Sequence, residues 1–149
     1  FMIRYAHANL IAKNAPALIA FYRQALGCRS IGETRDLSGA WLDRLTGIEN
    51  AHLTGEHLAL PGYEGHGPTL EIFTYSAMPD SPSGAVNTPG FAHIAFEVDD
   101  VSEALDRVLS CGGGTVGELV RSTYADGRTI CVVYATDPEG NILELQGWS

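Results

Sequence analysis

The sequence predicts an α+β protein made of two similar halves, each with the order strand–helix–strand–strand–strand. In each half, a helical pattern follows a short apolar strand, and the last strand is apolar with a glutamate at its centre. The segment between the halves, AMPDSPSGAVNTPG at 77–90, is rich in Pro, Ser and Gly. We interpret this repeated pattern as an internal duplication.

A single domain over 1–149 is the expected organisation, because chains of this length commonly form one compact unit. Within it we expect a first module at 2–76, a linker at 77–90 and a second module at 91–149. Hydrophobic residues make up 45% of the chain and charged residues 18%, which is typical of a globular protein.

The first module begins with a strand and a well-delimited helix. Asn14 is expected to cap the helix, Pro16 is tolerated in its first turn, and Gly27 ends it. The elements expected in this module are strands at 4–11, 29–35, 52–60 and 68–75 and helices at 15–26 and 38–47.

The second module repeats this order. Asp100 is expected to cap its helix, with Glu103 at the capping-box position, and the turn DPEGN at 137–141 separates the last two strands. The elements expected here are strands at 91–98, 115–121, 128–135 and 141–147 and a helix at 101–111.

Four residues occupy matched places in the two modules. His7 lies seven residues before the cap of the first helix, and His93 lies seven before the cap of the second. Glu71 and Glu144 lie at the centres of the two final strands, TLEIF and ILELQ. Because side chains alternate along a strand, each glutamate points away from its apolar neighbours. A carboxylate at mid-strand is costly to desolvate without a partner.

These four residues are predicted to bind one divalent metal ion. Taken singly, a strand histidine is more often a packed or edge residue, and a strand glutamate usually faces solvent. Matched positions in two halves favour a shared ligand set of His7, Glu71, His93 and Glu144. Two nitrogens and two oxygens suit Zn, Ni, Co, Mn or Fe(II), and no thiolate of a structural zinc site is present in the set.

Charge and cysteine content exclude several classes of partner. The formal net charge is −9 with only 9 Lys and Arg, so we expect neither nucleic-acid nor membrane binding.

We also find no signal-peptide pattern and no apolar run of the roughly 20 residues that span a bilayer. Three cysteines without CxxC spacing fit a reduced, cytoplasmic protein. The expected partner is a small-molecule substrate.

Three segments resemble the vicinal-oxygen-chelate superfamily: FAHIAFEVDDV at 91–101, DPEGNILELQ at 137–146 and AFYRQALGC at 20–28. This superfamily includes glyoxalase I, methylmalonyl-CoA epimerase, extradiol dioxygenases and the fosfomycin and bleomycin resistance proteins. The resemblance implies two βαβββ modules that form a cupped mixed sheet around one metal ion. It also implies a homodimer, and it leaves open whether the metal site lies within one chain or is shared between two.

The ligand set is most similar to that of glyoxalase I, which carries His or Gln, Glu, His and Glu at the four places. The epimerase usually has Gln where Glu71 stands, and dioxygenases use only His, His and Glu. Bacterial glyoxalase I enzymes have an arginine and an asparagine for glutathione where this chain has Ile11 and Tyr75. These replacements favour a less charged small molecule.

The resemblance implies a metal-dependent, glyoxalase-like lyase or isomerase that transfers a proton next to a carbonyl. Glu144 is expected to be the base, and Glu71 would serve the opposite face. Alternatives are a small-molecule-sequestering protein of the bleomycin-resistance type and an Fe(II) dioxygenase.

The residues assigned to the substrate pocket are Asn9, Phe73 and Tyr75. Ordinary packing explains the two aromatic residues equally well, as it does Trp148. Of the three remaining histidines, His57 is a minor candidate for the pocket rim, and the others are expected at the surface.

Overall fold

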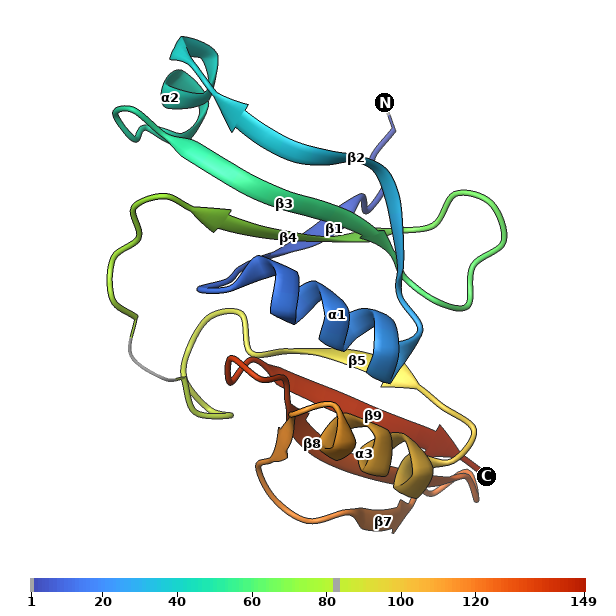
Figure 1. The fold of residues 1–149 in the computed structure, drawn as a ribbon. Helices are drawn as coiled ribbons and strands as arrows, with labels where there is room; N and C mark the ends of the chain where they lie inside the picture. The colour runs from blue at the N-terminus through green and yellow to red at the C-terminus, as the bar shows by residue number, and fades with distance from the viewer. Residues whose placement is uncertain (1, 82–83) are drawn as a thin grey trace. The chain divides into compact units, whose positions relative to one another are not determined.

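The computed structural model describes residues 2–81 and 84–149, which belong to two compact units, Phe1–Ser81 and Pro82–Ser149 (Figure 1). The boundary falls inside the 77–90 segment, of which residues 82 and 83 lie outside the described residues. Each unit contains a mixed sheet and one long helix, so the predicted α+β class is confirmed.

The first unit contains a four-stranded sheet in the order β1-β4-β3-β2. Its elements are β1 (His7–Ile11), α1 (Ala15–Leu26), β2 (Arg29–Ser38), α2 (Ala40–Thr46), β3 (His52–Ala59) and β4 (Thr69–Tyr75). β1 pairs with β4 in parallel, whereas the β2–β3 and β3–β4 pairs are antiparallel.

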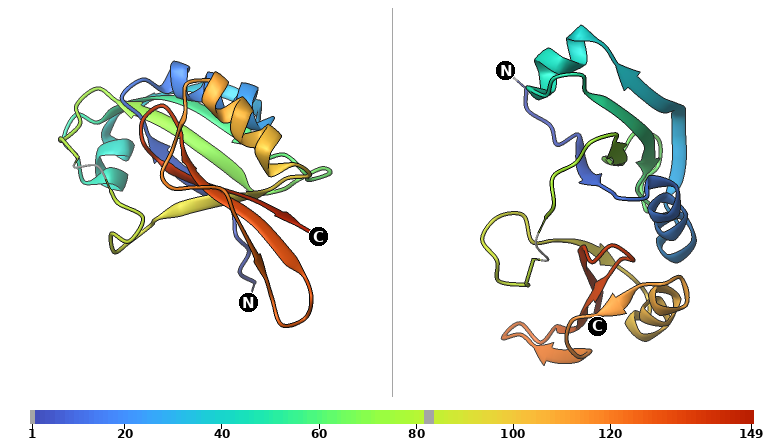
Figure 2. Two further views of the ribbon diagram at one scale, coloured as in Figure 1. Left: turned by 90° about the horizontal axis from the view of Figure 1, so that it is seen from below. Right: turned by 60° about the vertical axis from the view of Figure 1, so that its left-hand side comes forward.

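The two ends of α1 are those predicted. Asn14 Oδ1 accepts a hydrogen bond from Ala17 N at 3.1 Å, and Gly27 ends the helix with φ 73°. One face of α1, which includes Leu18 and Tyr22, is fully buried against β3 and β4. Figure 2 shows this helix lying along one face of its sheet.

The second unit contains a five-stranded sheet in the order β5-β9-β8-β6, with β7 also paired to β8. Its elements are β5 (His93–Glu97), α3 (Val101–Ser110), β6 (Gly114–Thr115), β7 (Val120–Thr123), β8 (Thr129–Thr136) and β9 (Ile142–Trp148). Asp100 caps α3 as predicted, because its Oδ1 accepts from Glu103 N at 3.0 Å. α3 packs on β8 and β9.

The prediction of a single strand at 115–121 is wrong. Thr115 pairs with Ala135 and Val120 pairs with Val132, so the four residues between them on this segment face only two on β8. The surplus residues must leave the ladder. The segment is therefore two short strands, β6 and β7, on either side of 116–119.

The alternation predicted for the last strands is observed in both units. Leu70 and Ile72 on β4, and Leu143 and Leu145 on β9, are at most 1% exposed. These side chains lie on the helix-covered face of each sheet, so the intervening glutamates point to the other face.

Gly55 allows the backbones of β3 and β4 to approach closely. It has φ 153°, and a Cβ atom there would lie 2.0 Å from the Ile72 carbonyl oxygen and 2.8 Å from Phe73 Cδ1. Neither contact can be relieved by turning a flexible side-chain end. The position therefore requires a glycine.

We expect Gly55→Ala to lower the free energy of unfolding by about 3 kcal/mol, because β3 and β4 must move apart to admit the methyl group. Urea denaturation followed by circular dichroism measures this change. Gly117→Ala is the matched control, since a Cβ there meets nothing within 4 Å. Equal stabilities for the two variants would contradict the close approach.

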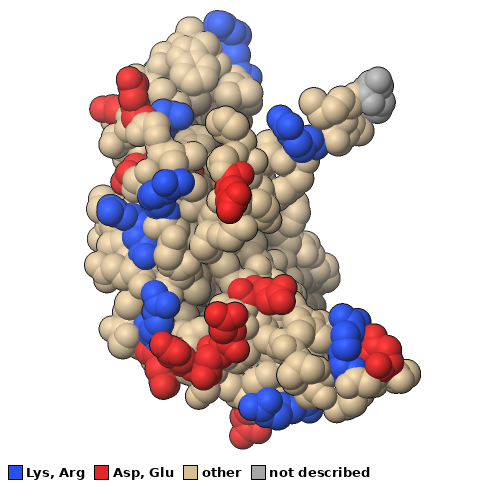
Figure 3. Space-filling model, turned by 90° about the vertical axis from the view of Figure 1, so that its right-hand side faces the viewer, with Lys and Arg blue, Asp and Glu red and all other residues tan. Residues whose placement is uncertain are grey.

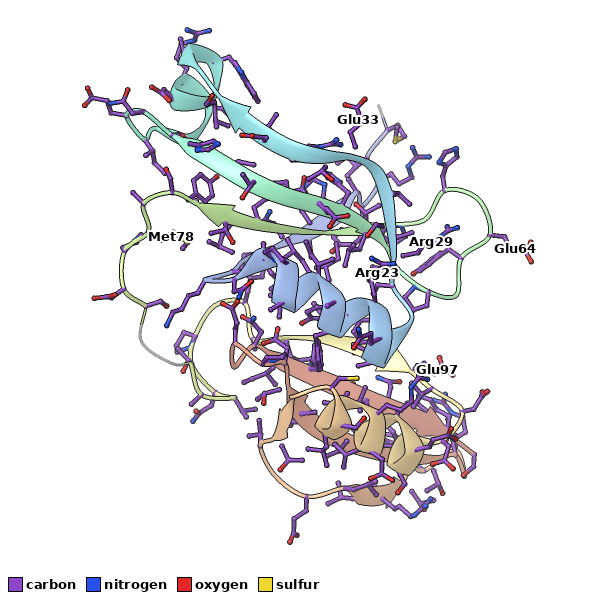
Figure 4. The ribbon with its side chains drawn as sticks, viewed as in Figure 1. Arg23, Arg29, Glu33, Glu64, Met78 and Glu97 are labelled. Atoms are coloured by element: carbon purple, nitrogen blue, oxygen red, sulfur yellow. The ribbon has the colours of Figure 1, made fainter. Side chains whose placement is uncertain are left out.

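The thiol of Cys28 is buried where α1 is followed by β2. Cys28 is 4% exposed, and burial raises the pKa of its thiol to about 11. It borders a hollow that is also lined by Arg23 and Arg29, and Figure 4 shows these two side chains near the junction of α1 and β2. Cys111 and Cys131 are partly exposed.

We expect iodoacetamide at pH 8 to label Cys111 and Cys131 before Cys28. The raised pKa lowers the reactive thiolate fraction of Cys28 roughly 100-fold, and burial blocks access as well. Time-resolved peptide mass spectrometry measures the three rates. Labelling in urea is the control, because the differences should vanish once the chain unfolds. A Cys28 that reacts first in the folded protein would refute the burial.

Candidate metal centre

The carboxylate of Glu71 is surrounded by donors from the two strands beside β4. His7 on β1 places Nε2 2.8 Å from Oε1, and His57 on β3 places Nε2 2.6 Å from Oε2. Asn9 Nδ2 donates to Oε1 at 3.3 Å. The glutamate side chain is only 14% exposed. Both oxygens of a largely buried carboxylate therefore have partners, as its desolvation requires.

His57 is closer to the site than the sequence indicated. Its side chain is 22% exposed, and it is the register partner of Glu71 across the β3–β4 ladder. Burial lowers the pKa of His57 below its usual value, an effect that the Glu71 carboxylate opposes and that Arg35 and His7 reinforce. A neutral imidazole is also the form that binds metals. Only the strand register, which the sequence does not specify, would have identified this contact.

The remaining histidines of the first unit lie at the surface, as expected. His52 Nε2 is 2.6 Å from Asp36 Oδ1, and both side chains are exposed. His66 is exposed in the segment between β3 and β4.

The second predicted pair lies in the second unit. His93 Nε2 is 3.9 Å from Glu144 Oε1, and the two side chains are 30% and 16% exposed. The ring of Tyr134, the register partner of Glu144, lies 5.1 Å from the ring of His93. Glu144 Oε2 accepts a hydrogen bond from Gln146 Nε2 at 2.7 Å.

The register explains why each histidine meets its glutamate. Glu71 pairs with Asn9 in the parallel β1–β4 ladder, and Glu144 pairs with Ala95 in the parallel β5–β9 ladder. His7 and His93 each precede that paired residue by two positions, so both lie on the same face as the glutamate. The two units thus present one imidazole and one carboxylate in the same way.

The donor chemistry of the two pairs fits a divalent transition metal. Among residues 2–81 and 84–149, no group of three or more His, Cys, Asp or Glu side chains is arranged to hold an ion. The four-residue ligand set therefore stays a prediction, to which each unit contributes half.

The residues assigned to the substrate pocket have different environments. Asn9 contacts Glu71 directly. Phe73 is 8% exposed in a hydrophobic cluster with Leu42 and Leu53, and Tyr75 packs against that cluster. Packing thus accounts for much of the surface of both aromatic residues, and a role in substrate binding stays a prediction.

Acidic and basic side chains both occur on the face shown in Figure 3. No helix in the described part of the chain is long and apolar enough to cross a membrane.

Comparisons with known proteins agree with this architecture. The family model described as the Glyoxalase/Bleomycin resistance protein/Dioxygenase superfamily matches residues 4–145, which is nearly the whole chain. The chain belongs to this superfamily. The resemblance found in the sequence is therefore confirmed.

Individual relatives of the superfamily are distant. An ethylmalonyl-CoA/methylmalonyl-CoA epimerase from Cereibacter sphaeroides is 24% identical over 149 positions, which cover 96% of each protein. A glyoxalase family protein from Bacillus cereus shares the fold with a TM-score of 0.83 and 22% identity, over 99% of this chain and 95% of that one.

A second similar structure holds a metal. A variant of the fosfomycin resistance protein FosX from Listeria monocytogenes, complexed with Mn(II) and 1S,2S-dihydroxypropylphosphonic acid, has a TM-score of 0.59 and 17% identity. The match covers 99% of this chain and 93% of the FosX chain. At these identities, the two structures show a common fold.

Asp137 holds the turn that precedes β9, the strand that carries Glu144. This residue is 2% exposed, and its carboxylate accepts from Glu139 N at 2.8 Å, from Asn141 N at 3.0 Å and from Asn141 Nδ2 at 2.7 Å. These bonds fix the chain where it enters the glutamate-bearing strand.

Asp137→Ala should lower the free energy of unfolding by about 1–3 kcal/mol, because two backbone N–H groups lose their acceptor in a partly buried turn. Chemical denaturation measures this value. Asp106→Ala, an equal truncation at an exposed position of α3, should change stability by less than about 0.5 kcal/mol. A loss no larger than that of the control would show that the carboxylate does not hold the turn.

Proposed function

We propose that this chain is a divalent-metal-dependent enzyme that transfers a proton next to a carbonyl group of a small acyl substrate. The observation that carries this proposal is the pair of largely buried carboxylates, Glu71 and Glu144, each at mid-strand beside an imidazole. Two such carboxylates can serve an isomerisation or an epimerisation, one to remove a proton and one to return it.

The residues that would hold the metal are His7, Glu71, His93 and Glu144. A bound Zn, Ni, Co, Mn or Fe(II) ion would polarise the substrate carbonyl and thereby acidify the neighbouring C–H group. Members of the superfamily are found with divalent metals, as the Mn(II) complex of the FosX variant illustrates.

The two carboxylates differ in how many partners they have, and this difference assigns their roles. Glu71 has an imidazole nitrogen against each oxygen and an amide donor as well. The amide of Gln146 occupies Oε2 of Glu144, whereas among residues 2–81 and 84–149 the one polar neighbour of Oε1 is His93 Nε2 at 3.9 Å. Glu144 Oε1 is thus free to accept a proton, which makes Glu144 the proposed base.

Similarity to the epimerase supports proton transfer at carbon as the type of reaction. We therefore place thioesters of the kind that this relative's name specifies first among substrates to test. Ile11 and Tyr75, which replace the glutathione-binding residues expected in bacterial glyoxalase I, make a glutathione adduct the less favoured choice.

The test is exchange of the substrate proton for deuterium, followed by proton NMR in D2O with Mn, Co, Ni or Zn added. Methylmalonyl-CoA, ethylmalonyl-CoA and the glutathione hemithioacetal of methylglyoxal are the three probes. We expect exchange into at least one, and Glu144→Gln should slow it at least about 100-fold, because the amide cannot take up the proton. Glu118→Gln, at an exposed position before β7, should leave the rate unchanged.

Three results would overturn the proposal or part of it. Exchange at the normal rate in Glu144→Gln would remove this residue from the base role. Tight binding of a probe without exchange would favour a sequestering protein of the bleomycin-resistance type, and oxygen consumption with Fe(II) would favour a dioxygenase.

A further inference from the structure

The carboxylate of Glu144 ends a chain of two hydrogen bonds that runs along one face of β9. Trp148 Nε1 donates to Gln146 Oε1 at 2.6 Å, and Gln146 Nε2 donates to Glu144 Oε2 at 2.7 Å. The three residues are spaced two apart, so they point to the same side of the strand. All three are partly buried, which strengthens such bonds relative to water.

The chemistry of the two end groups fixes the direction of this chain. An ionised carboxylate only accepts hydrogen bonds, and an indole N–H only donates. The amide of Gln146 lies between them, so it satisfies both neighbours only with its nitrogen toward Glu144 and its oxygen toward Trp148. Rotating the amide by 180° would break both bonds, so Trp148 reinforces the orientation of Gln146 that Glu144 requires.

Trp148 is itself held in place by the β7–β8 hairpin. Its ring stacks on Tyr124 with centroids 5.5 Å apart and an interplanar angle of 23°. The guanidinium carbon of Arg128 lies 4.7 Å from the Trp148 ring centroid, and Arg128 Nε donates to Asp126 Oδ2 at 2.8 Å. The indole is therefore held by two neighbours from the β7–β8 hairpin, Tyr124 and Arg128.

We propose that Gln146, oriented by Trp148, is a positioning residue that holds Glu144 with Oε1 turned toward His93. This inference rests on the proposed function, because it concerns how the proposed ligand and base is presented. The amide occupies Oε2, and Oε1 is the oxygen 3.9 Å from His93 Nε2. Groups that orient a metal ligand in this way typically change metal affinity 10–100-fold when they are removed.

The first unit does the same task by different means. There the imidazole of His57 occupies Oε2 of Glu71 and leaves Oε1 to His7 and the amide of Asn9. The position two residues after Glu71 is Phe73, which is buried and has no hydrogen-bonding side chain. The Gln146–Trp148 chain therefore belongs to the second unit alone among the described residues.

The experiment uses Gln146→Met, which keeps the length of the side chain but removes the amide, and Trp148→Phe, which keeps an aromatic ring but removes the N–H donor. Trp41→Phe is the matched control, because Trp41 lies on α2 and is 48% exposed. Thermal unfolding establishes that each variant is folded. If one variant does not fold, metal binding by the other is sufficient for the test.

We measure two quantities that would not change together if Gln146 had a purely structural role. The first is the ¹H–¹⁵N resonance of the Trp148 indole in metal-free protein, which Trp41→Phe assigns by eliminating the other indole signal. The second is the affinity for Mn(II) and Zn(II) by isothermal titration calorimetry. We expect Gln146→Met to shift the indole resonance, and both variants to weaken metal binding roughly 10-fold, while Trp41→Phe binds as the wild type does.

The outcomes separate this inference from the proposed function. Wild-type metal affinity in both folded variants overturns the positioning role even if the enzyme is active. An indole resonance that Gln146→Met does not move overturns the hydrogen-bond chain itself. Weakened metal binding in the variants, together with no deuterium exchange by the wild type, supports the positioning role and rejects the proposed reaction. A wild type that binds no metal overturns both.

Discussion

The parallel pairing of the first strand of each unit with the last is the constraint on which the site depends. In the β1–β4 and β5–β9 ladders, this pairing sets a histidine two positions before the residue opposite the glutamate. The helix that joins the first strand to the rest of its unit covers the other face and buries the flanking leucines and isoleucine. An imidazole and a carboxylate are thereby left together on the face that the helix does not cover, where the carboxylate is largely shielded from water and needs partners.

Local signals in the sequence were sufficient for the helices and for the two glutamate strands. Asn14 and Asp100 act through contacts three residues away, and the alternation in β4 and β9 needs no knowledge of other strands. What the sequence did not specify is how strands pair. The break between β6 and β7 and the contact of His57 with Glu71 both depend on register, which is set by long-range packing.

The two units keep the same pairing but support their glutamates differently. Glu71 is held by an imidazole from the neighbouring strand β3, whereas Glu144 is held by an amide from its own strand. Tyr134 takes the register position in the second unit that His57 has in the first, and it contacts the ring of His93 instead of the carboxylate. A duplicated framework thus carries two carboxylates with different numbers of partners, and this asymmetry underlies the roles proposed for them.

Gly55 shows that a residue without a side chain can influence such a site. By allowing β3 to approach Ile72 and Phe73 of β4, it sets the strand that carries His57 beside Glu71. In a saturation mutagenesis scored only by growth or turnover, position 55 would resemble a ligand, since nearly every replacement would reduce the signal. Separating cellular abundance from specific activity would sort such framework positions from those that perform chemistry.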